Sequence, residues 1–186
     1  MLKDKLNLDV FSSVSKDQRY FLRNGLIALI LWLIVGHYAP IHNFLVQNLA
    51  EASSSVIGWI SNEYPDTYES EMFEKTNGYK LWNLSDHRGR ICVGSPCDGW
   101  DLFYLCAAFI FVFPGFSLKR KITYALSGII ILYITNVLRV VGLFHILRVY
   151  PDWFETFHKT IFQVIVYLIM FAVWLLFLRG KKSEKK

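Results

Sequence analysis

SPCDGWD, residues Ser95–Asp101, marks the point where a polar segment meets a long apolar run. Ser95, Pro96 and Asp98 fit the N-cap, the first and the third position of a helix. In this register Cys97 is the second helical residue. It then lies beside free backbone N–H groups and the positive end of the helix dipole, which favour a thiolate. The sequence therefore predicts a reactive cysteine at the start of an apolar helix.

The composition indicates an integral membrane protein. Of the 186 residues, 54% are hydrophobic, the mean hydropathy is +0.33, and the apolar residues occur in long runs. The net charge of +5 does not indicate a nucleic-acid-binding protein, because the basic residues flank the apolar runs instead of forming one face. The three cysteines lack the spacing of a disulfide framework or a zinc site. The sequence contains no phosphate-binding loop, no H-E-x-x-H and no G-x-S-x-G motif.

Four strong apolar runs predict transmembrane helices of about the twenty residues that a bilayer requires. They cover residues 21–40, 102–118, 122–147 and 160–178. Residues 41–60 mix apolar and polar side chains at helical spacing, which favours an interfacial or re-entrant helix, or one packed inside the bundle. We expect an all-α polytopic membrane protein with one membrane domain over residues 21–178. Residues 1–20 and the basic residues 179–186 would form cytoplasmic tails.

The segment 61–97 is the only sizeable polar region between the apolar runs. Within it, residues 79–84 and 90–94 have the composition of strands and flank Ser85–Gly89. This pattern predicts a small β-hairpin with a five-residue loop. Such a hairpin would deliver the chain to Cys97 from a strand.

The basic residues predict which side of the membrane each segment occupies. Thirteen of the 20 Lys and Arg residues form three groups. They are Lys3, Lys5, Lys16, Arg19 and Arg23; Lys119, Arg120 and Lys121; and Arg179, Lys181, Lys182, Lys185 and Lys186. The positive-inside rule places all three groups in the cytoplasm and the segment 61–97 outside. Four strong spans satisfy this rule only if residues 41–60 do not cross the membrane.

Three chemically reactive side chains are then expected at similar depth on the outer face. Cys97 opens the second strong span, and His158 lies at the start of the last. Arg139 is 18 residues beyond Lys121. That separation is about 27 Å along a helix, near the far edge of a hydrocarbon core about 30 Å thick. Asn136 lies one turn before Arg139 on the same face, where it would hold the guanidinium or donate to a substrate carbonyl.

These side chains fit acyl transfer. Cys97 as a thiolate would attack a peptide carbonyl, and Arg139 would stabilise the thiolate or the developing oxyanion. His158 would carry the proton to the leaving amine and from the incoming nucleophile. No metal or organic cofactor is expected, because the nucleophile is a side chain.

Each of these residues also has a structural interpretation. Arg139 would then pair with Asp98 or Asp101, or extend to the lipid headgroups. A Cys92–Cys97 disulfide would block the chemistry. His158 would be an ordinary interface residue; its rival His145 also lies outside but is poorly aimed at the same point. Cys106 would face lipid or the core.

The motifs resemble those of a known family. Cys97-Asp98-Gly99, Asn136-Val-Leu-Arg139 and His158 match, in order, the C-x-G, N-x-x-R and H motifs of the exosortase/archaeosortase family. The chain looks like its short exosortase F-type members over about residues 25–178. One departure is that many members carry a glycine a few residues after the histidine, and His158–Gln163 has none.

The resemblance implies a membrane cysteine transpeptidase in the bacterial cytoplasmic (inner) membrane, with its site on the outer side. Cys97, Arg139 and His158 would be catalytic, and the supporting residues would be Asn136, Asp98 and Gly99. The implied partner is an exported protein with a C-terminal motif, hydrophobic helix and basic tail. It would be cleaved through a thioester and passed to an acceptor, which is water or a lipid or glycan amine. Membrane lipid is the second expected partner. The alternative is a non-catalytic assembly or chaperone module whose 61–97 loop binds exported proteins.

Overall fold

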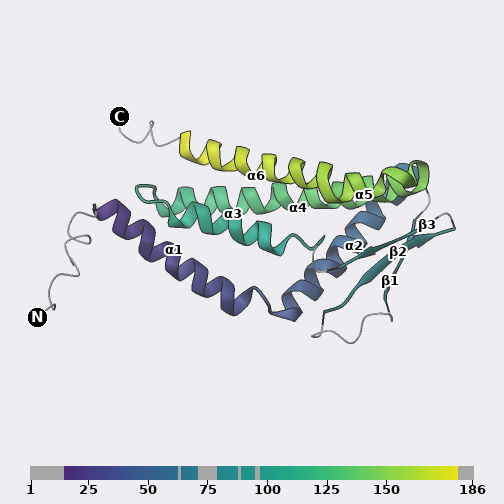
Figure 1. Ribbon diagram of the computed structural model, residues 1–186, viewed down its shortest axis with the longest axis horizontal. Coiled ribbons are helices and arrows are strands. Elements are labelled where there is room, and N and C mark those ends of the chain that lie inside the picture. Colours follow the sequence, from purple (N-terminus) through teal and green to yellow (C-terminus); the bar gives the residue numbers. More distant parts are fainter. Residues whose placement is uncertain (1–14, 63, 71–78, 88, 95–96, 180–186) are drawn as a thin grey trace, which may run out of the picture.

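The computed structural model describes residues 15–62, 64–70, 79–87, 89–94 and 97–179 (Figure 1). The helices are α1 (Lys16–Val35), α2 (Ala39–Ser61), α3 (Trp100–Val112), α4 (Leu118–Val149), α5 (Phe154–Thr156) and α6 (Phe162–Arg179). A 3-10 turn (Pro151–Trp153) and a π-helix (Phe157–Ile161) flank α5. The strands are β1 (Asp66–Glu69), β2 (Trp82–Asp86) and β3 (Gly89–Val93). Most of the two expected tails, and Ser95 and Pro96, lie outside the described residues.

Three helical segments of the described chain are long and apolar enough to cross a membrane. They are Lys16–Val35, Leu118–Val149 and Pro151–Arg179. The expectation of four strong spans is therefore wrong, and the error lies in the second. Helix α3 has 13 residues, about 20 Å at 1.5 Å per residue, which is shorter than a hydrocarbon core of about 30 Å.

The early end of α3 follows from two residues within the uncharged run 102–118. Pro114 does not continue a helix, and Gly115 adopts a φ of 83°, which returns the chain toward α4. The run is thus a short helix followed by a turn. Because residues 102–118 contain no charged residue, their composition predicted one continuous span and did not indicate this break.

Helix α2 packs one face against the rest of the fold and leaves Phe44, Trp59 and Ile60 exposed. It contacts α4 and the sheet, and it is not among the segments of the described chain that qualify as spans. Its buried residues lie on one face: His42, Val46, Leu49, Ala50, Ser53, Ser54, Ile57 and Gly58. The polar members of this face place hydrogen-bonding groups in the interior.

The helices of the bundle run between two distinct ends (Figure 1). At one end, Lys121 Nζ donates to Tyr20 Oη at 3.3 Å and to the Phe111 carbonyl at 2.9 Å. A guanidinium nitrogen of Arg120 donates to the Phe177 carbonyl at 2.9 Å. These bonds hold the start of α1, the end of α3, the start of α4 and the end of α6 together. We call this the basic end; the described members of all three basic groups lie in these segments.

The opposite end carries the small sheet, which is antiparallel in the order β1-β2-β3. The predicted β2–β3 hairpin is confirmed, but its loop has two residues, because Asp86 pairs with Gly89 and Ser85 with Arg90. Strand β1 was not predicted, and it extends the hairpin to a three-stranded sheet. Arg148 near the end of α4 forms an ion pair with Asp86. This contact fixes the hairpin over the C-terminal half of α4.

Candidate active site

Cys97 lies in a turn before α3, so the predicted helix register is wrong. Its N–H donates to the Gly94 carbonyl at 2.7 Å, whereas α3 begins three residues later at Trp100. Gly99 has a φ of 78°, and Asp98 Oδ1 accepts from the Trp100 N–H at 2.9 Å. The left-handed glycine interrupts the helical path, and Asp98 provides the first acceptor for the helix. The helix dipole therefore does not act on Cys97 in the way the sequence suggested.

Helix α4 holds this turn through Asn136. The Asn136 side chain is 1% exposed, and its Nδ2 donates to the Cys97 carbonyl at 2.6 Å. Its Oδ1 has no hydrogen-bond partner among the described residues, so Asn136 fixes the backbone of the cysteine and does not hold the guanidinium. A Cβ at Gly99 would lie 3.1 Å from Asn136 Nδ2 and 3.1 Å from the Phe103 ring. Glycine at this position allows the close approach.

Cys97, Arg139 and His158 line one cavity of about 290 Å³. They come from the turn before α3, from α4 and from the π-helix before α6. The other lining residues are Arg90, Ile91, Cys92, Val93, Val140, Leu143, Leu147 and Phe154. The rival His145 is exposed and does not line this cavity. The structure thus brings the three side chains of the sequence hypothesis to one place.

Arg139 is buried without a charge partner. It is 7% exposed, its Nε has no hydrogen-bond partner, and no carboxylate of the described chain forms an ion pair with it. Asp98 is instead bonded to His42, and Asp101 accepts from Trp32 Nε1 at 3.1 Å. The alternative in which Arg139 pairs with Asp98 or Asp101 is therefore not the one the structure adopts.

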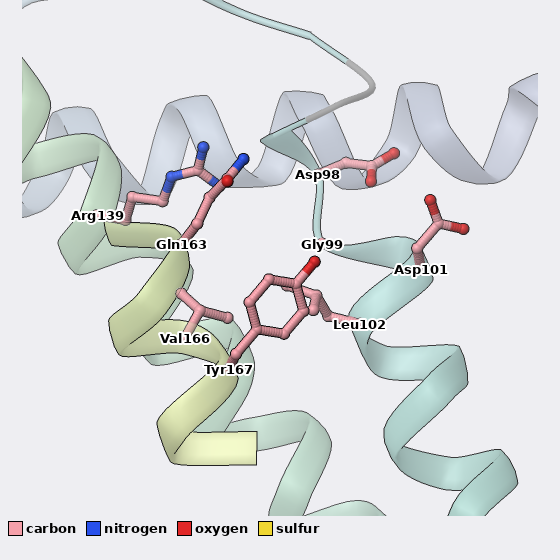
Figure 2. A pocket seen from close by; sticks show the side chains of 8 residues that line it. All are labelled: Asp98, Gly99, Asp101, Leu102, Arg139, Gln163, Val166 and Tyr167. Carbon is pink, nitrogen blue, oxygen red and sulfur yellow. The ribbon is translucent and has the colours of Figure 1, made fainter. Parts of the chain in front are cut away.

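A second cavity of about 150 Å³ reaches Arg139 from the gap between α3 and α6. Figure 2 shows Arg139 beside Gln163 on one side of this cavity and Asp98 and Asp101 on the other. The Asp98 carboxylate points away from the guanidinium. Arg139 therefore separates two openings, one toward the sheet and one toward α6.

His158 lies in an irregular segment that the sequence did not indicate. The five-residue π-helix Phe157–Ile161 carries it, and π-turns occur frequently at functional sites. The imidazole stacks on the Phe154 ring, with a centroid distance of 5.7 Å and an interplanar angle of 17°. This contact fixes the ring at the cavity wall.

His42 and Asp98 form a buried pair that sequence reasoning missed. His42 Nδ1 bonds to Asp98, and His42 Nε2 lies 2.9 Å from the Gly36 carbonyl. Burial lowers the pKa of His42, but the Gly36 carbonyl and the Asp98 carboxylate outweigh burial and raise the pKa above its ordinary value. The pair joins the α1–α2 corner to the residue after Cys97. The only signal in the sequence was the polar content of residues 41–60.

The three cysteines are free. Cys92 and Cys97 line the same cavity without forming the disulfide that would block Cys97. Cys106 is fully buried in the core between α3, α4 and α6, one of its two expected positions. Among the described residues, no group of three His, Cys, Asp or Glu side chains is placed to hold a metal ion.

The motif segments Cys97–Gly99 and Asn136–Arg139 and the residue His158 come from separate parts of the chain and meet at one end of the bundle. Comparisons with protein-family models, with curated proteins and with solved structures found no match.

Proposed function

We propose that this protein is a membrane-embedded cysteine transpeptidase or protease that cleaves the C-terminal sorting signal of exported proteins. The observation that carries the proposal is the single cavity lined by Cys97, Arg139 and His158. The elements that line it, among them β3, the C-terminal half of α4 and α5, lie at the end of the bundle opposite the basic end (Figure 1). The positive-inside rule assigns the basic end to the cytoplasm. The resemblance of the three motifs to the exosortase/archaeosortase family supports the same assignment.

The proposed reaction begins when the Cys97 thiol transfers its proton to His158. The thiolate attacks the carbonyl carbon of the scissile peptide bond, and a C–S bond forms. When the C–N bond breaks, His158 returns the proton to the leaving amine, and a thioester remains on Cys97. An acceptor amine or water then attacks the thioester carbonyl, forms the new C–N or C–O bond and gives a proton to His158. The C–S bond breaks, and His158 passes this proton to the leaving sulfur, which regenerates the Cys97 thiol.

Arg139 would stabilise the negative charge of this reaction. A buried cation without a partner is unfavourable unless an anion completes its surroundings. The oxyanion of the tetrahedral intermediate, or the thiolate itself, would supply that charge at the moment it develops. Groups that stabilise an oxyanion in this way typically contribute about 10² to 10³ in rate.

The position of the site suits a substrate that arrives within the membrane. The substrate's hydrophobic helix would lie in the lipid beside the bundle, with its scissile bond at the outer headgroup level. Its basic tail would remain on the cytoplasmic side, as the positive-inside rule requires. We place the protein in the bacterial cytoplasmic membrane on this basis.

Substitution of Cys97 tests the proposal. A reporter protein carrying a tripartite C-terminal signal from an exported protein of the same cell is followed for cleavage. Cys97→Ala should abolish cleavage, whereas Cys106→Ala, a buried cysteine outside the cavity, should retain it. Continued cleavage by Cys97→Ala would leave the non-catalytic assembly module as the better account.

A further inference from the structure

Strand β3 has one unpaired edge. The sheet order is β1-β2-β3, so within the described residues β3 pairs with β2 alone. The Ser70 N–H donates to the Leu81 carbonyl at 2.8 Å, and hydrogen-bonded pairs alternate along an antiparallel ladder. Leu81, Asn83 and Ser85 therefore direct their backbone groups to β1. The residues between them and after them, Leu84 and Asp86, form the hydrogen bonds with Ile91 and Gly89 of β3. In β3, the N–H and C=O groups of Arg90 and Cys92 therefore point to the free edge.

The catalytic cavity runs along this edge. Successive side chains of a strand point to opposite faces, and Ile91 and Val93 are buried while Arg90 and Cys92 are exposed. A cavity on one face would touch only one of these pairs, yet all four residues line the cavity. Within the sheet, β3 is the strand that packs against α4. The space beside β3 is therefore continuous with Cys97.

The wall opposite β3 is apolar. Val140 and Leu143 of α4 are buried there and pack with Ile91 and Val93, whereas Leu147 and Phe154 are half-buried and can contact an incoming chain. Arg139 and His158 line the same cavity. A polypeptide in this space would contact backbone donors and acceptors on one side and an apolar surface on the other.

We propose that the substrate segment around the scissile bond binds as a fourth strand on the free edge of β3. The identity of this partner, an exported polypeptide in extended conformation, rests on the proposed function. An extended chain at the membrane face needs partners for its N–H and C=O groups, and Arg90 and Cys92 provide them. Binding through added strands is largely independent of sequence, with selectivity at alternate side chains. Apolar residues are preferred at the positions that face α4.

Proline substitutions at the two edges of the sheet test this binding mode. Cys92→Pro removes an N–H from the β3 edge, and proline is tolerated at edge positions whose N–H does not face the sheet. Thr67→Pro is the matched control, because Thr67 alternates with the bonded residues of β1 and faces the opposite edge. Cleavage of the reporter should fall at least tenfold further in Cys92→Pro than in Cys92→Ala, and by less than twofold in Thr67→Pro. Equal losses at both edges, or none at Cys92, would overturn the proposal.

A binding measurement separates this proposal from the proposed function. A photo-crosslinking amino acid replaces Arg90, or Tyr68 of β1 as control, in a Cys97→Ser background that does not cleave. The position-90 variant should capture the signal-bearing reporter at least fivefold more than the position-68 variant. Capture at 90 without any cleavage by the wild type would retain the strand-binding mode and reject the transpeptidase. Cleavage by the wild type without capture at position 90 would retain the transpeptidase and reject the strand-binding mode. A cooperative thermal unfolding transition in each proline variant shows that the variant is folded.

Discussion

The two ends of the bundle each bury a cation of α4, and the two cations differ in their surroundings. Lys121 at the basic end is 5% exposed and Arg139 at the other end is 7% exposed. Lys121 donates to a tyrosine hydroxyl and a backbone carbonyl, whereas Arg139 has an unpartnered Nε and no ion pair among the described residues. The two cations are buried to a similar extent, but within the described chain only Lys121 has hydrogen-bond partners for its charged group.

Under the proposed function, this difference distinguishes a structural charge, Lys121, from a functional one, Arg139. An unsatisfied buried polar group costs about 1–3 kcal/mol, and more when it is charged. A partner that arrives from outside, such as a substrate oxyanion, would satisfy such a group. Lys121 joins α1, α3 and α4 without further ligands, whereas Arg139 faces two cavities.

Substitution of Arg139 should reduce activity without reducing stability, and substitution of Lys121 should do the opposite. The loss of activity at Arg139 is the largest effect we expect. Arg139→Met should lower cleavage of the reporter by about 10² to 10³ and leave the thermal midpoint unchanged or raised, because a buried unpaired charge is removed. Lys121→Met should lower the thermal midpoint while the folded fraction stays active. Activity and unfolding are measured on the same detergent-solubilised samples. A large loss of stability in Arg139→Met with normal activity would reverse the two assignments.

The two ends also contain matched glycines with left-handed backbones, Gly99 with a φ of 78° and Gly115 with a φ of 83°. Alanine at either position is expected to destabilise the fold by about 1–2 kcal/mol. Only Gly99→Ala should also reduce cleavage, by about tenfold, which corresponds to an activation barrier raised by about 1.4 kcal/mol. The reason is that its Cβ would press on Asn136 and displace the Cys97 turn. Equal activity of the two folded variants would show that the Asn136 contact does not position the cysteine.

The smallest expected effect is the pH dependence that the His42–Asp98 pair confers. Because the pKa of His42 is raised in the fold, its stabilisation is complete below the unfolded value of about 6.5 and declines as pH rises through the folded pKa. His42→Asn should remove this decline from a series of thermal midpoints, and Lys121→Met should keep it. Parallel curves for wild type and His42→Asn would show that the pair does not titrate in this way.

The sequence predicted the parts of the structure that depend on local pattern. The long apolar helices, the β2–β3 hairpin and the shared face of Asn136 and Arg139 all follow from periodicity within a short window. The grouping of basic residues likewise agrees with the segments that meet at the basic end. These features need no knowledge of what packs against them.

The missed features depend on contacts between distant segments or on local backbone breaks. Because of Gly99 and Asp98, α3 begins at Trp100, later than predicted, and because of Pro114 it ends at Val112, earlier than predicted. The His42–Asp98 bond joins residues 56 positions apart, and neither residue has a local pattern that indicates the other. The unpaired state of Arg139 was equally invisible, because Asp98 and Asp101 follow Cys97 closely in sequence yet bond to α2 and α1.

The central claim is that Cys97 forms a covalent bond with the substrate. Wild-type protein is mixed with the signal-bearing reporter, quenched in acid during turnover, and analysed by intact and peptide mass spectrometry. We expect an adduct with the mass of the reporter fragment before the cleaved bond, located on Cys97 and released by hydroxylamine, as a thioester requires. Cleavage of the reporter with the adduct on Cys92, or with no adduct and undiminished cleavage by Cys97→Ala, would contradict the account.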